Sequence, residues 1–164
     1  MGAERYRKVF AWFSSRPDAF RWLVRLNRWL PRLFYVLYPA LLAALGALRD
    51  ARFLRVLLVP AAAFALCTLL RRAVRAQRPC ERLQIEPLIA HRGTRNSFPS
   101  RHMACAAVIA AAYGCVYPAA GFALGVLAIG IAVVRVLAGI HFPRDVAAGA
   151  ALGLGVGVLG FWVL

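Results

Sequence analysis

His141 and Asp145 are the residue pair best suited to chemistry, because they stand four positions apart in the stretch HFPRD. If a helix begins at Pro143, a residue that suits the first helical turn, the carboxylate can reach one imidazole nitrogen. Such a hydrogen bond fixes the tautomer of the ring and leaves the other nitrogen free to act as a base or a nucleophile. A structural cap made by the same His–Asp pair is the alternative interpretation.

A second histidine follows the polar stretch RNSFPSRHMAC at residues 95–105, where a long apolar segment begins. Ser97 or Ser100 can cap the helix predicted there, and Pro99 suits its first turn. Free N–H groups at a helix N-terminus attract anions, so His102 would lie beside any anion bound there. A plain helix cap with side chains at the membrane surface explains the stretch equally well.

Arginines accompany both histidines. Arg71, Arg75 and Arg78 share one face if the apolar segment before them stays helical. Arg135 lies inside an apolar segment, where a charge is costly and normally faces a partner or a polar cavity. Guanidinium groups bind phosphate oxygens in a forked geometry. An arginine collar extending to lipid headgroups is the alternative for the first three.

The composition indicates that lipid surrounds much of the chain. Of 164 residues 62% are hydrophobic, where soluble domains have roughly 45–50%. The 21 Lys and Arg residues against 6 Asp and Glu give a net charge of +15, which favours an anionic partner. Nucleic acid fits poorly, because the arginines alternate with apolar segments. A phospholipid surface or a phosphorylated substrate fits better.

Five apolar segments predict an all-α fold, a polytopic membrane bundle of about five transmembrane helices: 33–48, 53–70, 103–117, 121–140 and 146–164. A span needs roughly 17–25 residues, so the first and third must include flanking positions. Residues 18–32 carry arginines at helical spacing opposite Trp and Leu side chains, which is typical of a helix lying in the membrane interface. We therefore expect an amphipathic interfacial segment at 1–32 and a catalytic transmembrane domain at 33–164.

The order of these segments brings their polar ends together. If each segment spans once, the end of the second, the start of the third, the end of the fourth and the start of the fifth face one side. The last segment carries Gly149, Gly153 and Gly157, a spacing that permits close helix contact. We favour packing within the chain over a homodimer through this face.

Together the three groups resemble the signature of the type 2 phosphatidic acid phosphatase (PAP2) superfamily. The matching residues are Arg71-x6-Arg78-Pro79, Pro99-Ser100-Arg101-His102 and Arg135-x5-His141-x3-Asp145. The resemblance implies that His141 attacks phosphorus to form a phosphohistidine, that Asp145 orients it, and that His102 protonates the leaving oxygen. It also implies that Arg71, Arg78, Arg135, Ser100 and helix N–H groups hold the phosphoryl oxygens, so that no metal or other cofactor is required.

Three positions depart from the family pattern. Arg71 stands where lysine is usual, Arg101 replaces the usual glycine, and Val134 replaces a serine. None of these changes removes a chemical role, so we expect an active enzyme. The additional Arg101 guanidinium would add a phosphate contact or select a more highly charged headgroup.

The sequence thus predicts a phosphatase of the cell (inner) membrane that acts on a lipid phosphate monoester or diphosphate. Arg101 favours a polyprenyl diphosphate such as undecaprenyl diphosphate. Phosphatidylglycerol phosphate, phosphatidate and a lipid A phosphate are alternative substrates, and transfer to another lipid is an alternative reaction. A non-enzymatic lipid-binding protein is disfavoured, because both histidines are present.

Two criteria disagree about the side of the membrane that the site faces. The resemblance implies an outward-facing, extracytoplasmic site. The basic residues of 1–32, which lie on the side of the site, predict a cytoplasmic location by the positive-inside rule.

Overall fold

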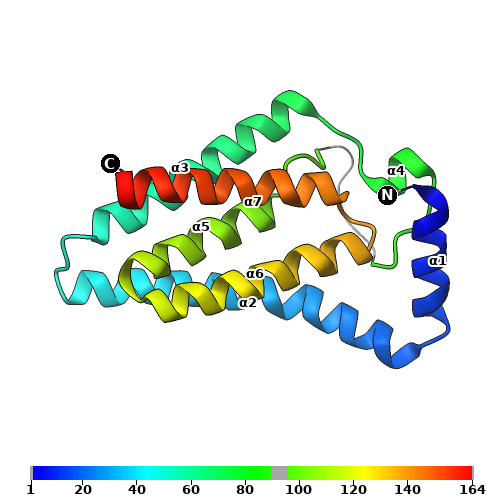
Figure 1. The fold of residues 1–164 in the computed structure, drawn as a ribbon, viewed down its shortest axis with the longest axis horizontal. Coiled ribbons are helices and arrows are strands. Elements are labelled where there is room, and N and C mark those ends of the chain that lie inside the picture. The colour runs from blue at the N-terminus through cyan, green and yellow to red at the C-terminus, as the bar shows by residue number, and fades with distance from the viewer. Residues whose placement is uncertain (1, 90–95, 164) are drawn as a thin grey trace.

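The computed structural model describes residues 2–89 and 96–163, and within these ranges it contains helices and no strand (Figure 1). The elements are α1 (Ala3–Ser14), α2 (Pro17–Ala47), α3 (Phe53–Val74), α4 (Pro79–Leu83), α5 (Arg101–Val116), α6 (Pro118–Leu137), α7 (Pro143–Val158) and a π-helical turn η1 (Leu159–Val163). The predicted all-α fold is confirmed.

Each of the five apolar segments forms a helix, as predicted. Within the described ranges, four helical segments are long and apolar enough to cross a membrane: those of α2, α3, α6 and α7 continued by η1. The fifth, α5, has 16 residues and is therefore about 24 Å long, less than the roughly 30 Å of a bilayer core. The chain is a polytopic helical bundle.

Helix α5 lies at the centre of the bundle and packs against α6, α7 and α3. Its face toward α7 is lined by small residues, so the two backbones approach closely. A Cβ atom on Gly149 would lie 2.5 Å from the carbonyl oxygen of Ser100, and one on Gly157 would lie 2.8 Å from Ala111 Cβ. Gly149, Gly153 and Gly157 therefore serve packing within the chain, and α5 occupies the face considered for a homodimer.

The N-terminal region differs from the expected arrangement. The predicted interfacial helix at 18–32 is not a separate element, because α2 continues without a break from Pro17 to Ala47. Its buried positions, from Leu23 through Phe34 to Leu45, run along the whole helix. The change of composition near residue 32 thus reflects a change in the surroundings of one continuous helix. A separate helix, α1, precedes it and crosses the end of the bundle (Figure 1).

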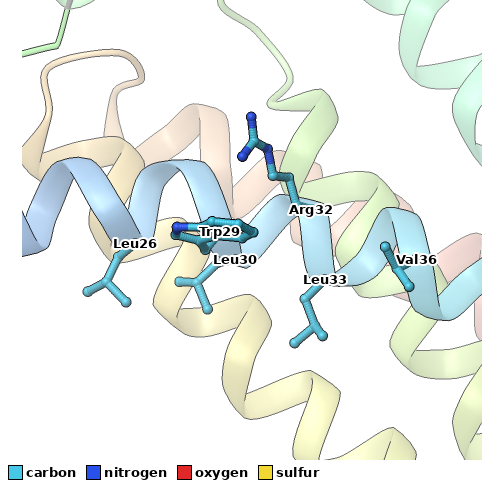
Figure 2. A pocket seen from close by; sticks show the side chains of 6 residues that line it. All are labelled: Leu26, Trp29, Leu30, Arg32, Leu33 and Val36. Atoms are coloured by element: carbon cyan, nitrogen blue, oxygen red, sulfur yellow. The ribbon is translucent and has the colours of Figure 1, made fainter.

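The first half of α2 presents tryptophan and arginine to its surroundings. Trp22 and Trp29 are about 60% exposed, and the guanidinium groups of Arg25 and Arg32 lie over their rings at 5.5 and 5.1 Å. An apolar groove of about 370 Å³ follows this helix (Figure 2). It is lined by Leu26, Trp29, Leu30, Arg32, Leu33 and Val36.

The polar ends of the helices meet at one end of the bundle, as the order of the segments predicts. The Ser97 N–H donates to the carbonyl oxygen of Ala76, and the Ser100 N–H donates to that of Asp145, both at 2.8 Å. These bonds join the stretch before α5 to the segment after α3 and to the start of α7. Chain segments far apart in sequence thereby form one framework.

Candidate active site

His141 lies in the loop 138–142 that joins α6 to α7, and its side chain is only 3% exposed. The loop folds back on the end of α6, because the N–H groups of Ile140 and His141 both donate to the carbonyl oxygen of Arg135. Helix α7 begins at Pro143, as predicted, and the Phe142 N–H donates to Asp145 Oδ2 at 3.0 Å. Asp145 therefore holds the start of the helix that carries it.

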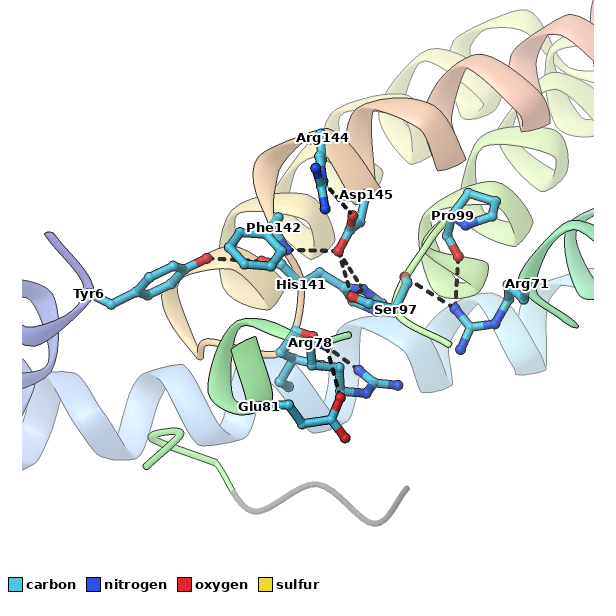
Figure 3. A network of polar contacts seen from close by, with 11 residues as sticks. Tyr6, Arg71, Arg78, Glu81, Ser97, Pro99, His141, Phe142, Arg144 and Asp145 are labelled. Atoms are coloured by element: carbon cyan, nitrogen blue, oxygen red, sulfur yellow. Dashed lines mark hydrogen bonds and ion pairs between the residues drawn. The ribbon is translucent and has the colours of Figure 1, made fainter. Parts of the chain in front are cut away.

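The structure brings His141 and Asp145 together, but a serine stands between them (Figure 3). Ser97 Oγ lies 3.2 Å from His141 Nδ1 and donates to Asp145 Oδ2 at 2.5 Å. The direct distance from Nδ1 to Oδ2 is 3.7 Å, which is too long for a hydrogen bond. The carboxylate thus acts on the imidazole mainly through the hydroxyl group of Ser97.

This chain of contacts determines the tautomer of His141. Because the Ser97 hydroxyl donates its hydrogen to the carboxylate, its oxygen accepts from an N–H at Nδ1. Nε2 then carries the free electron pair. Burial lowers the pKa of His141 below its ordinary value of 6.5, although the nearby carboxylate of Asp145 opposes that shift. The imidazole is therefore neutral near pH 7 and can act as a nucleophile.

Three of the predicted arginines are fixed close to this loop. Arg71 Nη1 donates to the carbonyl oxygen of Pro99 at 2.7 Å, and Arg78 Nη1 donates to that of Ile140 at 3.0 Å. Arg78 and Arg135 are only 5% and 7% exposed. Such buried guanidinium groups concentrate positive charge around His141.

Several buried hydrogen-bond donors at this end make no bond to the part of the chain that the structure describes. They are Nε of Arg78, Nε of Arg135 and the hydroxyl of Ser100. Unpaired buried donors are rare because each one is costly. A phosphoryl group, which offers several oxygen acceptors, is a ligand that suits such donors.

The other predicted residues are placed as follows. His102 lies in the first turn of α5 and lines a small cavity together with Tyr35 and Phe34 of α2. Arg101 is exposed, and its guanidinium lies 5.5 Å from the ring centre of Phe64. Among residues 2–89 and 96–163 no group of three or more His, Cys, Asp and Glu side chains could hold a metal.

Two sequence expectations about this region are corrected by the structure. Arg75 does not share a face with Arg71 and Arg78, because α3 ends at Val74 and Arg75 adopts a left-handed conformation with φ 46°. Ser100 is the N-cap residue of α5, but its side chain makes no cap hydrogen bond. Ser97, considered only as a cap, bonds instead to His141 and Asp145. No spacing along the chain reveals that role, because its partners lie 44 and 48 residues away.

The family of the chain follows from a match to a known protein family. Residues 52–164 match the model of the PAP2 superfamily. The chain belongs to the PAP2 superfamily. The resemblance carried by the three motifs is thus confirmed, and this PAP2 protein is a phosphatase.

Known relatives agree with this assignment. Decaprenylphosphoryl-5-phosphoribose phosphatase of Mycobacterium tuberculosis is 38% identical over 127 residues, which are 73% of this chain and 67% of the relative. The crystal structure of Aquifex aeolicus LpxE has a TM-score of 0.75 at 26% identity and covers 97% of this chain and 93% of its own. The PAP2-type phosphatidylglycerolphosphate phosphatase of Bacillus subtilis shares the fold, with a TM-score of 0.59 at 23% identity over 94% and 90% of the two chains.

Proposed function

We propose that this PAP2 phosphatase hydrolyses the terminal phosphate of a polyprenyl lipid through a phosphohistidine at His141. The observation that carries the proposal is the set of buried donors of Arg78, Arg135 and Ser100 near the neutral imidazole of His141, since these donors find no partner among the described residues. These donors suit the oxygens of one phosphoryl group, and the imidazole suits the phosphorus atom.

In the first step Nε2 of His141 attacks phosphorus, an N–P bond forms, and the bond from phosphorus to the leaving oxygen breaks. His102 gives a proton to that oxygen. The positive charge that develops on the imidazole is stabilised by the carboxylate of Asp145 through Ser97. In the second step His102 takes a proton from water, the water oxygen bonds to phosphorus, and the N–P bond breaks to release phosphate.

The arginines stabilise charge on the phosphoryl oxygens during both steps. Arg71, Arg78 and Arg135 are held by burial or by bonds to backbone carbonyl groups, so little reorganisation is needed as the transition state forms. Phosphoryl transfer depends mainly on such positioning and electrostatic stabilisation. We therefore expect activity in the presence of EDTA.

The polyprenyl lipid is proposed from the relative in Mycobacterium tuberculosis, whose name specifies a decaprenylphosphoryl sugar phosphate. That substrate class combines a long isoprenoid tail with a terminal phosphate monoester. Arg101 gives less support to a diphosphate substrate than the sequence suggests, because its guanidinium group lies over the ring of Phe64. Undecaprenyl diphosphate therefore becomes the second substrate to test.

Phosphate release by the purified protein in detergent with EDTA tests the function. The substrates to compare are decaprenylphosphoryl-5-phosphoribose, undecaprenyl diphosphate, phosphatidylglycerol phosphate and phosphatidate, each with His141→Ala as the blank. We expect release that requires His141, with the decaprenyl substrate fastest. Equal release by His141→Ala would refute the phosphohistidine, and fastest release from a glycerolipid would refute the polyprenyl preference. Label appearing on a second lipid instead of free phosphate would show a phosphotransferase.

From the family resemblance we also propose that the site end faces away from the cytoplasm, and that α1 and the start of α2 lie in the membrane interface at that end. Helix α1 lies at the site end in Figure 1, so the basic N-terminal region and the site share one side. The test uses variants without native cysteines that carry Arg144→Cys, exposed at the site end, or Ala51→Cys, exposed in the turn before α3. A membrane-impermeant maleimide should label the Arg144→Cys variant in intact cells. Labelling of the Ala51→Cys variant alone would show the opposite orientation.

A further inference from the structure

Helix α1 supplies a buried tyrosine that contacts the backbone of His141. Tyr6 has 0% exposure, and its hydroxyl donates to the carbonyl oxygen of His141 at 3.2 Å across 135 residues of sequence (Figure 3). Burial, with a smaller effect from the charge of Asp145, raises the pKa of Tyr6 to about 12. The hydroxyl therefore remains a hydrogen-bond donor throughout the working pH range.

The backbone groups around His141 are each held by a different part of the chain. The carbonyl of Ile140 accepts from Arg78, and the N–H of His141 donates to the carbonyl of Arg135. The N–H of Phe142 donates to Asp145. These three partners belong to the phosphatase signature. The fourth group, the carbonyl of His141, is held by Tyr6, which lies outside the matched residues 52–164.

Helix α1 also packs directly on the loop that carries His141. Gly139 has φ 72°, and a Cβ atom there would lie 2.7 Å from Phe10 Cζ. The Tyr6 ring contacts Phe142 edge-on, with ring centres 6.3 Å apart. Phe13 belongs to the small buried cluster that includes Ala138 and Ile140. Residues on both sides of His141 are thus covered by one helix, so a displacement of α1 would displace the loop.

We propose that α1 is a positioning element of this phosphatase and that Tyr6 positions His141 through its backbone carbonyl. The inference rests on the proposed function, because it takes His141 as the nucleophile. A misplacement of about 1 Å can slow a reaction about a hundredfold, whereas in the described part of the chain Tyr6 makes no hydrogen bond with the arginines that would bind phosphate. The loss of the Tyr6 hydrogen bond should therefore slow the attack on phosphorus more than it weakens substrate binding.

The test is Tyr6→Phe in the full chain, which removes the hydroxyl and keeps the buried ring. Tyr113→Phe is the matched control, since the Tyr113 hydroxyl donates to a backbone carbonyl, that of Leu37, at 2.8 Å and lies toward the end of α5 remote from the site. The measurements are kcat, KM, the rate of phosphohistidine formation after rapid mixing, and the thermal midpoint. For Tyr6→Phe we expect kcat and that rate to fall about three- to tenfold with KM within about twofold.

The control separates positioning from a general loss of stability. We expect Tyr113→Phe to keep wild-type kcat even if its midpoint falls as far as that of Tyr6→Phe. An unchanged rate of phosphohistidine formation in Tyr6→Phe, or an equal loss of kcat in both variants, would overturn the inference and leave the phosphatase proposal intact. Wild-type turnover by His141→Ala would overturn the phosphatase mechanism itself, and with it the basis of this inference.

Discussion

Replacing Ser97 by alanine should slow phosphohistidine formation, because its hydroxyl joins Nδ1 of His141 to the carboxylate of Asp145. A hydrogen bond to a charged group contributes about 1.5–3 kcal/mol, and about 1.4 kcal/mol corresponds to a tenfold change in rate. The direct separation of 3.7 Å does not replace the lost bond. We therefore expect the rate to fall about ten- to a hundredfold.

A double-mutant cycle with Asp145→Asn shows whether the carboxylate acts through Ser97. If it does, the two substitutions interrupt the same chain of contacts, and the double variant should be little slower than the slower single variant. The assay is rapid mixing with radiolabelled lipid, followed by isolation of the phosphorylated protein. Losses that multiply in the double variant would refute the mediated contact. Thr68→Ala, which removes an exposed hydroxyl from α3, serves as the control and should keep the wild-type rate.

Other properties of the site can be tested with the same substrate. His141→Ala should abolish turnover with unchanged helix content by circular dichroism, because the nucleophile is lost from a loop, whereas Asp145→Asn should retain measurable turnover because the imidazole remains. Arg135→Gln should lower kcat/KM by about a hundredfold or more, because it removes a buried positive charge that would stabilise the transition state. The same substitution at the exposed Arg25 should leave kcat/KM unchanged. The acid limb of kcat/KM should lie below pH 6.5, because burial lowers the pKa of His141. The same shift predicts a thermal midpoint that falls as the pH drops below about 6.5, since the unfolded chain then binds the proton more readily than the folded one.

The helices, and the meeting of the candidate site residues at one end of the bundle, could be predicted from the sequence because their signals are local. The apolar segments predict the helices, and the order of these segments predicts that their polar ends lie on one side. His141 and Asp145 could be paired because they lie four residues apart at a helix start. Arg135 could be placed among the candidate site residues because a charge inside an apolar helix needs a polar partner.

The remaining features depend on contacts between distant parts of the chain. The role of Ser97 requires α7 to lie against the stretch before α5, and the role of Tyr6 requires α1 to fold over the loop before α7. The sequence does not reveal the continuity of α2 through residue 32, because arginine and tryptophan side chains are typical of a surface helix, although buried residues such as Leu23 continue the buried face of the spanning part. It does not reveal the end of α3 before Arg75 either, because no glycine marks it and an arginine adopts the left-handed conformation there.

The arginines that we propose as phosphate ligands also hold the scaffold. Arg71 stands where the family pattern usually has lysine, and its Nη1 donates to the carbonyl of Pro99 in the stretch that carries Ser97. Arg78 uses Nη1 to hold the carbonyl of Ile140, next to His141, and its buried Nε has no partner in the described part of the chain. A guanidinium has five donors in a rigid fork, whereas a lysine offers its three donors from a single point on a flexible stem. Each arginine can therefore bind backbone and phosphate at once, so a phosphoryl group held by these side chains is also held in register with the imidazole that attacks it.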